Sequence, residues 1–214
     1  MSIKLPKLKK VDFNKEKKKK ILLLSDDLRL HSGVGTMSRE IVYNTCHKYD
    51  WVQIGGAIKH PDKGKRIDVS EEVRSKTEVS DASVVVYPFD GYGNAEILRH
   101  LIQTEKPDAI MHFTDPRFWG WLWEIENEIR SVASLVYYHV WDNYPYPKFN
   151  KPFYDSNDVV CTISKVTDDI VRTVAPSVEA YHIPHAVDNN IFSKKEDAEL
   201  AEFKKELIQS SFFD

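Results

Sequence analysis

The stretch KILLLSD at residues 20–26, followed after a short loop by SGVGTMSREIV at 32–42, decides the fold. A continuous apolar run of this length is typical of a strand buried on both faces. The second stretch opens with two glycines and continues with apolar residues at helical spacing, which predicts a helix over 36–47. A strand, a loop and a helix in this order begin a βαβ unit, so we predict an α/β protein.

The rest of the chain repeats this alternation. Further strands are predicted at 51–58, 83–90, 108–113, 134–142, 157–164 and 179–188, and further helices at 94–105, 117–130, 165–174 and 195–209. Residues 59–82 are polar and are predicted to form a loop or a small excursion. Strands separated by helices of this length form parallel sheets. We therefore predict one Rossmann-like domain with a mostly parallel sheet and helices on both faces.

The composition is that of a folded globular protein. Of the 214 residues, 42% are hydrophobic and 12% aromatic, which excludes a disordered chain. The apolar runs are too short to span a bilayer. The two cysteines, Cys46 and Cys161, lie in apolar surroundings and are predicted to be buried free thiols. Free thiols fit a reducing compartment, so we expect a cytoplasmic protein.

Positive charge is concentrated at the start of the chain. Residues 1–20 hold nine lysines against Asp12 and Glu16, although the whole chain has a formal net charge of −3. An acidic body argues against a broad or specific nucleic-acid surface. Residues 1–19 are predicted to be a flexible, solvated arm. The alternative is that this arm makes a weak contact with an anionic membrane surface.

The segment Gly33-Val34-Gly35 leaves two interpretations open. A dinucleotide fingerprint needs a third glycine, where this chain has Ser38, and an acidic residue after the second strand, which is absent. The N–H groups at the start of the helix would favour a phosphate or a sugar hydroxyl. Alternatively, Ser32 or Thr36 is an ordinary N-cap and the glycines serve only the turn.

Three stretches carry a resemblance to a known family. SGVGTMSREIV at 32–42, VVCTISKVTDDIV at 159–171 and IPHAVDNNIF at 183–192 resemble, in this order and spacing, the retaining GT-B glycosyltransferases of the glycogen-synthase-like type (group 1, family 4). The last stretch resembles the signature IPxGVDxxxF, with Ala186 in place of the usual glycine. The likeness covers about residues 20–192.

The resemblance implies half of an active site. Residues 20–194 would form the N-terminal, acceptor-side domain, and 195–214 would lead to a donor-binding second domain, in a longer chain or as a partner. The co-substrate would be a nucleotide-diphosphate sugar, the acceptor a glycan, a lipid or another molecule, and the reaction a transfer with retention. No cofactor and no metal is implied. The alternative is a non-catalytic Rossmann-like module that binds a sugar, a nucleotide or a partner chain.

The family pattern also implies roles for individual residues. Gly33, Val34 and Gly35 would face the donor phosphate or sugar, His139 the donor sugar, and Ser164 the cleft wall, with His185 and Asp188 near the domain junction. Family members have His-Asp at the histidine, whereas here Val140 follows and Asp142 comes third. The role of Asp142 therefore stays open.

Other candidates have two interpretations each. His112, with Asp115 close behind it, ends a strand and could face an acceptor, but core or edge packing is preferred. The aromatic loop 141–149 would stack a sugar ring or cover the sheet edge. His182 and His185 have no obvious third ligand, so a structural role is favoured over a metal site.

Overall fold

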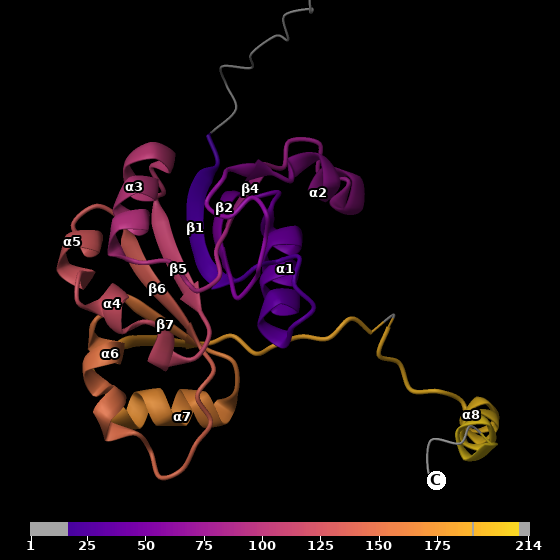
Figure 1. Cartoon of the computed structure of the whole chain (residues 1–214). Helices are drawn as coiled ribbons and strands as arrows, with labels where there is room; N and C mark the ends of the chain where they lie inside the picture. Colours follow the sequence, from indigo (N-terminus) through magenta and orange to yellow (C-terminus); the bar gives the residue numbers. More distant parts are fainter. Residues whose placement is uncertain (1–16, 190, 210–214) are drawn as a thin grey trace, which may run out of the picture. The chain divides into compact units, whose positions relative to one another are not determined.

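The protein is an α/β structure built on one sheet of eight strands. The computed structural model describes residues 17–189 and 191–209. The strand order is β3-β4-β2-β1-β5-β6-β7-β8. Figure 1 labels β4, β2, β1, β5, β6 and β7 of this sheet. All neighbouring strands are parallel except β3, which runs antiparallel to β4. The strands are β1 (Lys19–Asp26), β2 (Tyr49–Gly56), β3 (Ile67–Asp68), β4 (Val84–Pro88), β5 (Ala109–Phe113), β6 (Ser134–His139), β7 (Val159–Thr162) and β8 (Glu179–His182).

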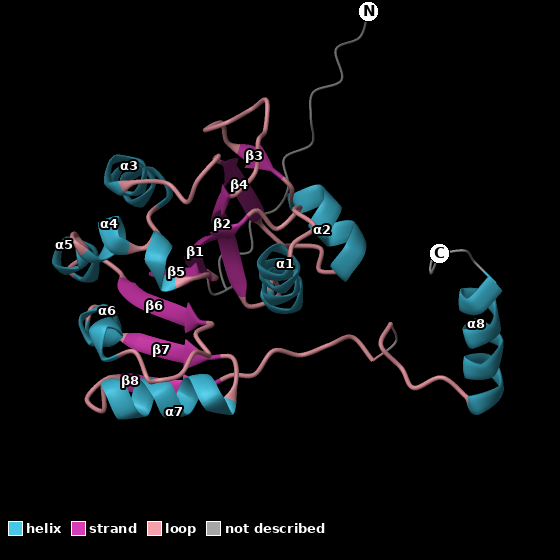
Figure 2. Ribbon diagram, turned by 60° about the horizontal axis from the view of Figure 1, so that its bottom comes forward, coloured by secondary structure: helices cyan, strands magenta, loops and turns pink. Residues whose placement is uncertain are grey.

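Helices cover both faces of the sheet (Figure 2). One face carries α1 (Gly33–Thr45) and α2 (Ser70–Thr77). The other face carries α3 (Ala95–Glu105), α4 (Gly120–Trp123), α5 (Glu126–Arg130), α6 (Lys151–Asp155) and α7 (Lys165–Val174), together with the short 3₁₀ turns Pro116–Phe118 and Lys148–Asn150. The predicted Rossmann-like fold, with a mostly parallel sheet and helices on both faces, is confirmed.

The chain divides into two compact units. The first ends at Pro184 and contains the whole sheet with α1 to α7. The second begins at His185 and contains α8 (Asp197–Gln209), which the sequence predicted at 195–209. The predicted boundary after residue 194 stays a prediction.

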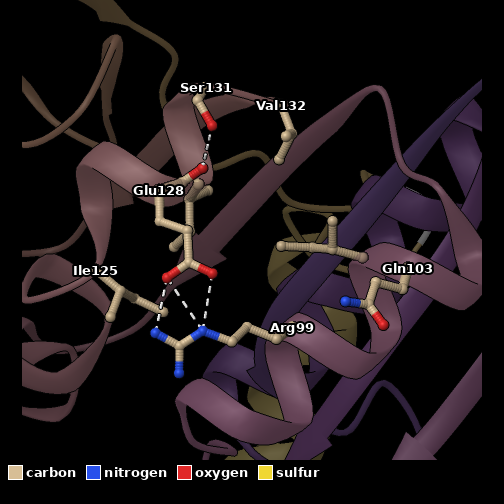
Figure 3. Close-up of a pocket in the computed structure, with 8 residues that line it drawn as sticks. Arg99, Gln103, Ile125, Glu128, Ser131 and Val132 are labelled. Atoms are coloured by element: carbon tan, nitrogen blue, oxygen red, sulfur yellow. Dashed lines mark hydrogen bonds and ion pairs between the residues drawn. The ribbon is translucent and has the colours of Figure 1, made fainter.

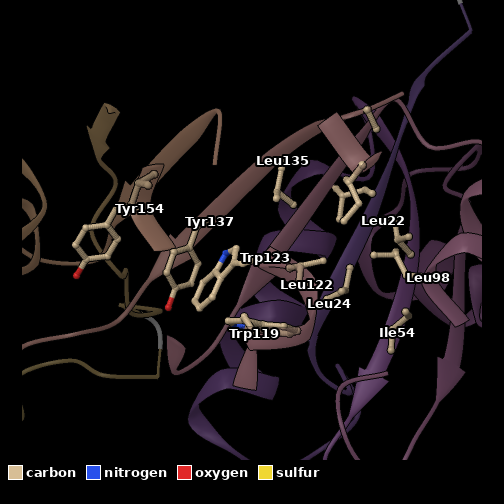
Figure 4. Close-up of a cluster of buried hydrophobic side chains, with 14 of the residues drawn as sticks. Leu22, Leu24, Ile54, Leu98, Trp119, Leu122, Trp123, Leu135, Tyr137 and Tyr154 are labelled. Carbon is tan, nitrogen blue, oxygen red and sulfur yellow. The ribbon is translucent and has the colours of Figure 1, made fainter. Parts of the chain in front are cut away.

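The side chains of β1 alternate between the two cores of the first unit. Leu22 and Leu24 belong to a cluster with Trp119, Tyr137 and the helices of their face (Figure 4). Leu23 points to the opposite face and packs in a second cluster with Val42 of α1. All three leucines are 0% exposed. Burying a leucine side chain contributes about 2 kcal/mol, so this strand alone is a large part of the hydrophobic stabilisation.

Two predicted segments differ from the structure in their elements, and one helix was not predicted. The helix predicted over 117–130 is divided into a 3₁₀ turn, α4 and α5, because Trp119 and Ile125 leave helical geometry at φ −107° and −114°. The segment 59–82, predicted as a loop or a small excursion, contains β3 and α2. The helix α6 was not predicted at all. Its Pro152 lies in the first turn, where the missing N–H has no partner in any helix.

Two expectations drawn from composition can be compared with the structure. Cys46 and Cys161 are buried and unpaired, as predicted. In the ranges 17–189 and 191–209, no helix is both long and apolar enough to traverse a lipid bilayer. Most of the predicted basic arm, residues 1–16, lies outside the described residues. The strand β1 already begins at Lys19.

The two glycines that begin α1 are expected to respond differently to substitution by alanine. A Cβ at Gly35 would lie 2.6 Å from the Leu30 carbonyl oxygen and 2.9 Å from that of Asp27, whereas a Cβ at Gly33 meets nothing within 4 Å. Gly35→Ala should lower the free energy of unfolding by about 1–3 kcal/mol. Gly33→Ala should leave it unchanged or raise it by up to about 1 kcal/mol. Urea denaturation measures the free energy of unfolding of both variants. Equal decreases would contradict the conclusion that only Gly35 is closely packed.

Candidate functional site

The strand order changes direction between β1 and β5. The chain runs from β1 through β2 to β4 on one side and from β5 to β8 on the other. In open α/β sheets, ligands bind outside the carboxyl ends of the strands at such a switch point. The segments that leave this edge are the loop from Asp26 to α1, the loop after β4 and the turn after β5. They form the candidate site.

A carboxylate from the end of β1 joins two of these segments. Asp26 accepts one hydrogen bond from the Ser32 hydroxyl at the start of α1 and one from the Tyr92 phenol, at 2.7 Å, in the loop after β4. Its exposed fraction is 7%. Burial and the hydrogen bond to Asp26 raise the pKa of Tyr92, so its phenol stays protonated as a donor. Sequence reasoning missed both residues, although an aspartate that ends the first strand was a usable signal.

A buried network beneath Asp26 fixes the path of the loop. The Gln53 amide donates to the Ser25 hydroxyl and to the Asp26 carbonyl, both at 2.8 Å, and accepts from the Leu28 N–H at 3.0 Å. The Ser38 hydroxyl donates to Ser25 at 2.9 Å. The residue that replaces the third glycine of a dinucleotide fingerprint therefore ties α1 to β1. This supports the sequence argument against a dinucleotide loop.

The next residue, Asp27, is fully buried and is compensated by Arg29. Arg29 donates from Nε to Oδ1 at 2.8 Å and from Nη2 to Oδ2 at 2.7 Å, and its pKa is raised by these hydrogen bonds. A Cβ at Gly55 would lie 2.5 Å from Asp27 Oδ2. The bare backbone of Gly55 at the end of β2 is therefore required to make room for this carboxylate.

The start of α1 has an ordinary N-cap and two N–H groups that no described residue accepts from. The Ser32 hydroxyl accepts from the Gly35 N–H at 2.9 Å, and the Ser32 carbonyl accepts from the Thr36 N–H at 2.8 Å. The predicted cap by Ser32 is confirmed, and the N–H of Gly35 is already used. Among the described residues, the N–H groups of Gly33 and Val34 have no protein partner. Gly33 is exposed, so a ligand can approach its backbone.

His139 lies inside the protein rather than at the surface of the site. Its exposed fraction is 0%, its Nε2 lies 2.8 Å from the Tyr154 hydroxyl of α6, and its ring packs against Tyr137. Burial and the neighbouring His112 lower its pKa to about 3, so the ring is neutral. A substrate cannot touch this ring in the conformation described.

His112 is a core residue. It stacks on Tyr137 with ring centroids 4.2 Å apart, and its Nε2 lies 2.7 Å from the side-chain oxygen of Asn157. The Asn157 amide donates to the Phe153 carbonyl, so its oxygen accepts and His112 carries its proton on Nε2. Burial lowers the pKa of His112 to about 3. Some buried ring nitrogens have no hydrogen-bond partner in the described part of the chain. They include Nδ1 of His112 and His139, and Nε1 of Trp119 and Trp123.

The remaining predicted residues of the first unit lie at the ends of elements. Asp115 accepts from the Arg117 N–H at 2.9 Å and forms an ion pair with its guanidinium. Burial disfavours ionisation of Asp115, but the hydrogen bonds from Arg117 outweigh it and lower the pKa. Ser164 caps α7 by accepting from the Thr167 N–H at 3.2 Å. Asp142 is exposed in the loop after β6.

His185 and Asp188 belong to the second unit. Both side chains are exposed. The candidate site is formed by segments of the first unit, to which neither residue belongs. Their place near a domain junction stays a prediction.

Three cavities of the first unit lie in different parts of the fold. One of about 190 Å³ lies between α3 and α5 beside the Arg99–Glu128 ion pair (Figure 3). Another of about 340 Å³ adjoins Asp158, just before β7 begins. The third, of about 390 Å³, adjoins Phe89, directly after β4 ends. Only the third of these opens at the carboxyl edge of the sheet. In the described ranges, no three His, Cys, Asp or Glu side chains gather closely enough to hold a metal ion.

Comparisons with known proteins add no relative. No protein-family model matches the chain, and a search of the curated proteins found none similar to it. The resemblance to GT-B glycosyltransferases therefore depends on the three sequence stretches themselves.

The two buried histidines are expected to make the protein sensitive to mild acid. Their pKa of about 3 in the folded protein compares with about 6.5 in an unfolded chain. Between these two pKa values the unfolded chain binds protons that the folded protein does not. The contribution of the two neutral histidines to the free energy of unfolding is therefore complete above pH 6.5 and is lost as the pH falls toward 3. When the pH falls from 7 to 5, the free energy of unfolding should decrease by about 2 kcal/mol for each of the two histidines.

Urea denaturation at both pH values measures this loss. His139→Gln should remove about half of it, whereas His47→Gln, at an exposed position, should leave it unchanged. An equal loss in the wild-type protein and in the two variants would contradict the lowered pKa values of the buried His112 and His139.

Proposed function

We propose that the first unit is the N-terminal, acceptor-side domain of a retaining glycosyltransferase that uses a nucleotide-diphosphate sugar. The observation that carries this proposal is the pair of unpartnered N–H groups, on Gly33 and Val34, at the switch point of the sheet. The first turn of a helix is a favourable place for a phosphate, since its N–H groups and dipole both attract negative charge.

The groups beside the start of α1 favour a phosphate in one place and a sugar in another. The carboxylate of Asp27 is compensated by Arg29, so it does not repel an anion at the start of α1. The carboxylate of Asp26 already accepts hydroxyl donors from Ser32 and Tyr92. A sugar hydroxyl is the same kind of donor, and this favours a sugar beside Asp26 with the diphosphate at Gly33 and Val34.

The N–H groups of Gly33 and Val34 would stabilise the leaving group of the proposed sugar transfer. Breaking the bond between sugar and diphosphate builds negative charge on the leaving group, and fixed N–H dipoles stabilise that charge. The family resemblance assigns the rest of the donor site to a second domain, in a longer chain or a partner. The unit by itself is then expected to bind the donor weakly and to transfer sugar poorly.

One observation favours a second candidate. Because His139 is fully buried under Tyr154, the residue that the resemblance casts as catalytic is out of reach of substrate in this conformation. A non-catalytic Rossmann-like module that holds a sugar or a nucleotide needs no such histidine. Donor binding without any donor hydrolysis, in a protein that also contains the second domain, would favour this module.

Substitution of Gly33 tests the binding site directly. Isothermal titration with UDP, GDP, ADP and their glucose conjugates should detect binding to the chain. Gly33→Ala, which places a methyl group in open space, should fold normally but weaken nucleotide binding by about tenfold or more, because the ligand can no longer approach the backbone. Its matched control is Gly120→Ala, which also opens a helix with free space around it, on the opposite face of the sheet. No nucleotide binding by the wild-type chain, or equal effects of the two variants, would overturn the proposal.

A further inference from the structure

The cavity of about 390 Å³ lies at the same edge of the sheet as the candidate site. It is bounded by the end of β4, by the first two turns of α3 and by Gly64 in the loop before β3. Sites for small organic molecules span about 300–1,000 Å³. The cavity is therefore large enough for one sugar ring with its hydroxyl groups.

Its lining combines flat apolar surfaces with a polar rim. Tyr87 and Phe89 contribute aromatic rings, and Leu101 contributes a buried aliphatic side chain. Glu96 and His100, four residues apart on α3 and so on one side of the helix, are exposed at the rim. A pyranose ring has the matching character, with C–H groups on its faces and hydroxyls around its edge. The carboxylate accepts from such hydroxyls, and the imidazole can donate or accept.

The Tyr87 side chain and the Phe89 backbone are held in place before any ligand arrives. The Tyr87 hydroxyl donates to Glu105 at 2.7 Å. The backbone of Phe89 is fixed on both sides, since its N–H donates to the Gly55 carbonyl at 2.8 Å and its carbonyl accepts from the Ile58 N–H at 3.3 Å. Gly64, with φ +74°, closes against the Phe89 ring, which a Cβ at this position would approach to 3.7 Å. A preorganised site loses less entropy on binding.

One short loop connects this cavity to the candidate site. Phe89 lines the cavity, and Tyr92, three residues later, donates to Asp26. The segment between them is bound to the residue after β2 through the hydrogen bond from the Ala57 N–H to the Gly91 carbonyl, at 3.4 Å. The loop that follows β4 therefore borders both the cavity and Asp26.

We propose that this cavity is the subsite for the acceptor and that it binds a hexopyranose ring against Phe89 and Tyr87. The acceptor role rests on the proposed transferase function, whereas the binding of a sugar ring does not. The acceptor is accordingly a carbohydrate, and its ring packs on the aromatic side chains while Glu96 and His100 bind its hydroxyls.

Saturation-transfer NMR and titration with methyl glycosides of glucose, galactose, mannose and N-acetylglucosamine test the proposal. At least one glycoside should bind, with contacts from the C–H face of its ring. Phe89→Leu keeps an apolar side chain but removes the ring, and it should weaken binding about three- to tenfold. Glu96→Gln with His100→Ala should weaken it further. Gln103→Ala is the control, since Gln103 is on the same helix but lines the cavity between α3 and α5.

The same proteins are titrated with the nucleotides, which separates the two proposals. Glycoside binding that Phe89→Leu weakens, with nucleotide binding unchanged, supports the subsite. Nucleotide binding without any glycoside binding overturns the subsite and leaves the transferase proposal standing. Glycoside binding without nucleotide binding supports the sugar site and overturns its acceptor role. Binding of p-nitrophenol in place of every glycoside would show that the cavity selects apolar aromatic molecules and would also overturn the inference.

Discussion

The structure depends on a central strand that is buried on every side. β1 pairs with β2 along one edge and with β5 along the other, and its leucines fill the cores on both faces. Such a strand has no polar face, so helices must cover both sides of the sheet. The chain can leave the strand only at its ends. The strand order reverses beside β1, so burial of this strand places the loop after it at the switch point of the sheet.

Polar groups at that end are held by the protein itself. Gln53, from the neighbouring strand, satisfies buried groups of Ser25, Asp26 and Leu28. A buried polar network whose members all have partners is rigid, since any movement leaves a donor or an acceptor unpaired. The loop between β1 and α1 is thus a fixed scaffold. The hydrophobic core below it sets its position, and this network sets its shape.

Local sequence patterns were sufficient for the fold, and only partly sufficient for the site. The continuous apolar runs predicted the long strands, and α7 has its predicted bounds because Ser164 provides a recognisable cap. Gly33 was found for the same local reason. The contact between Asp26 and Tyr92 joins residues 66 positions apart, and no local period encodes such a pairing. The hydrogen bond between His139 and Tyr154 likewise depends on a helix that the proline-rich sequence concealed.

The close fit between Gly55 and Asp27 links two strands in a further way. The carboxylate occupies the space that a side chain at position 55 would fill, so the two positions share one volume. A residue with a Cβ at 55 is compatible only with a shorter residue at 27, and a shorter residue at 27 leaves Arg29 without its partner. A side chain at position 55 therefore disturbs the pair of Asp27 and Arg29 as well. The end of β2, which carries no group of the candidate site, thereby restricts which sequences can form the loop after β1.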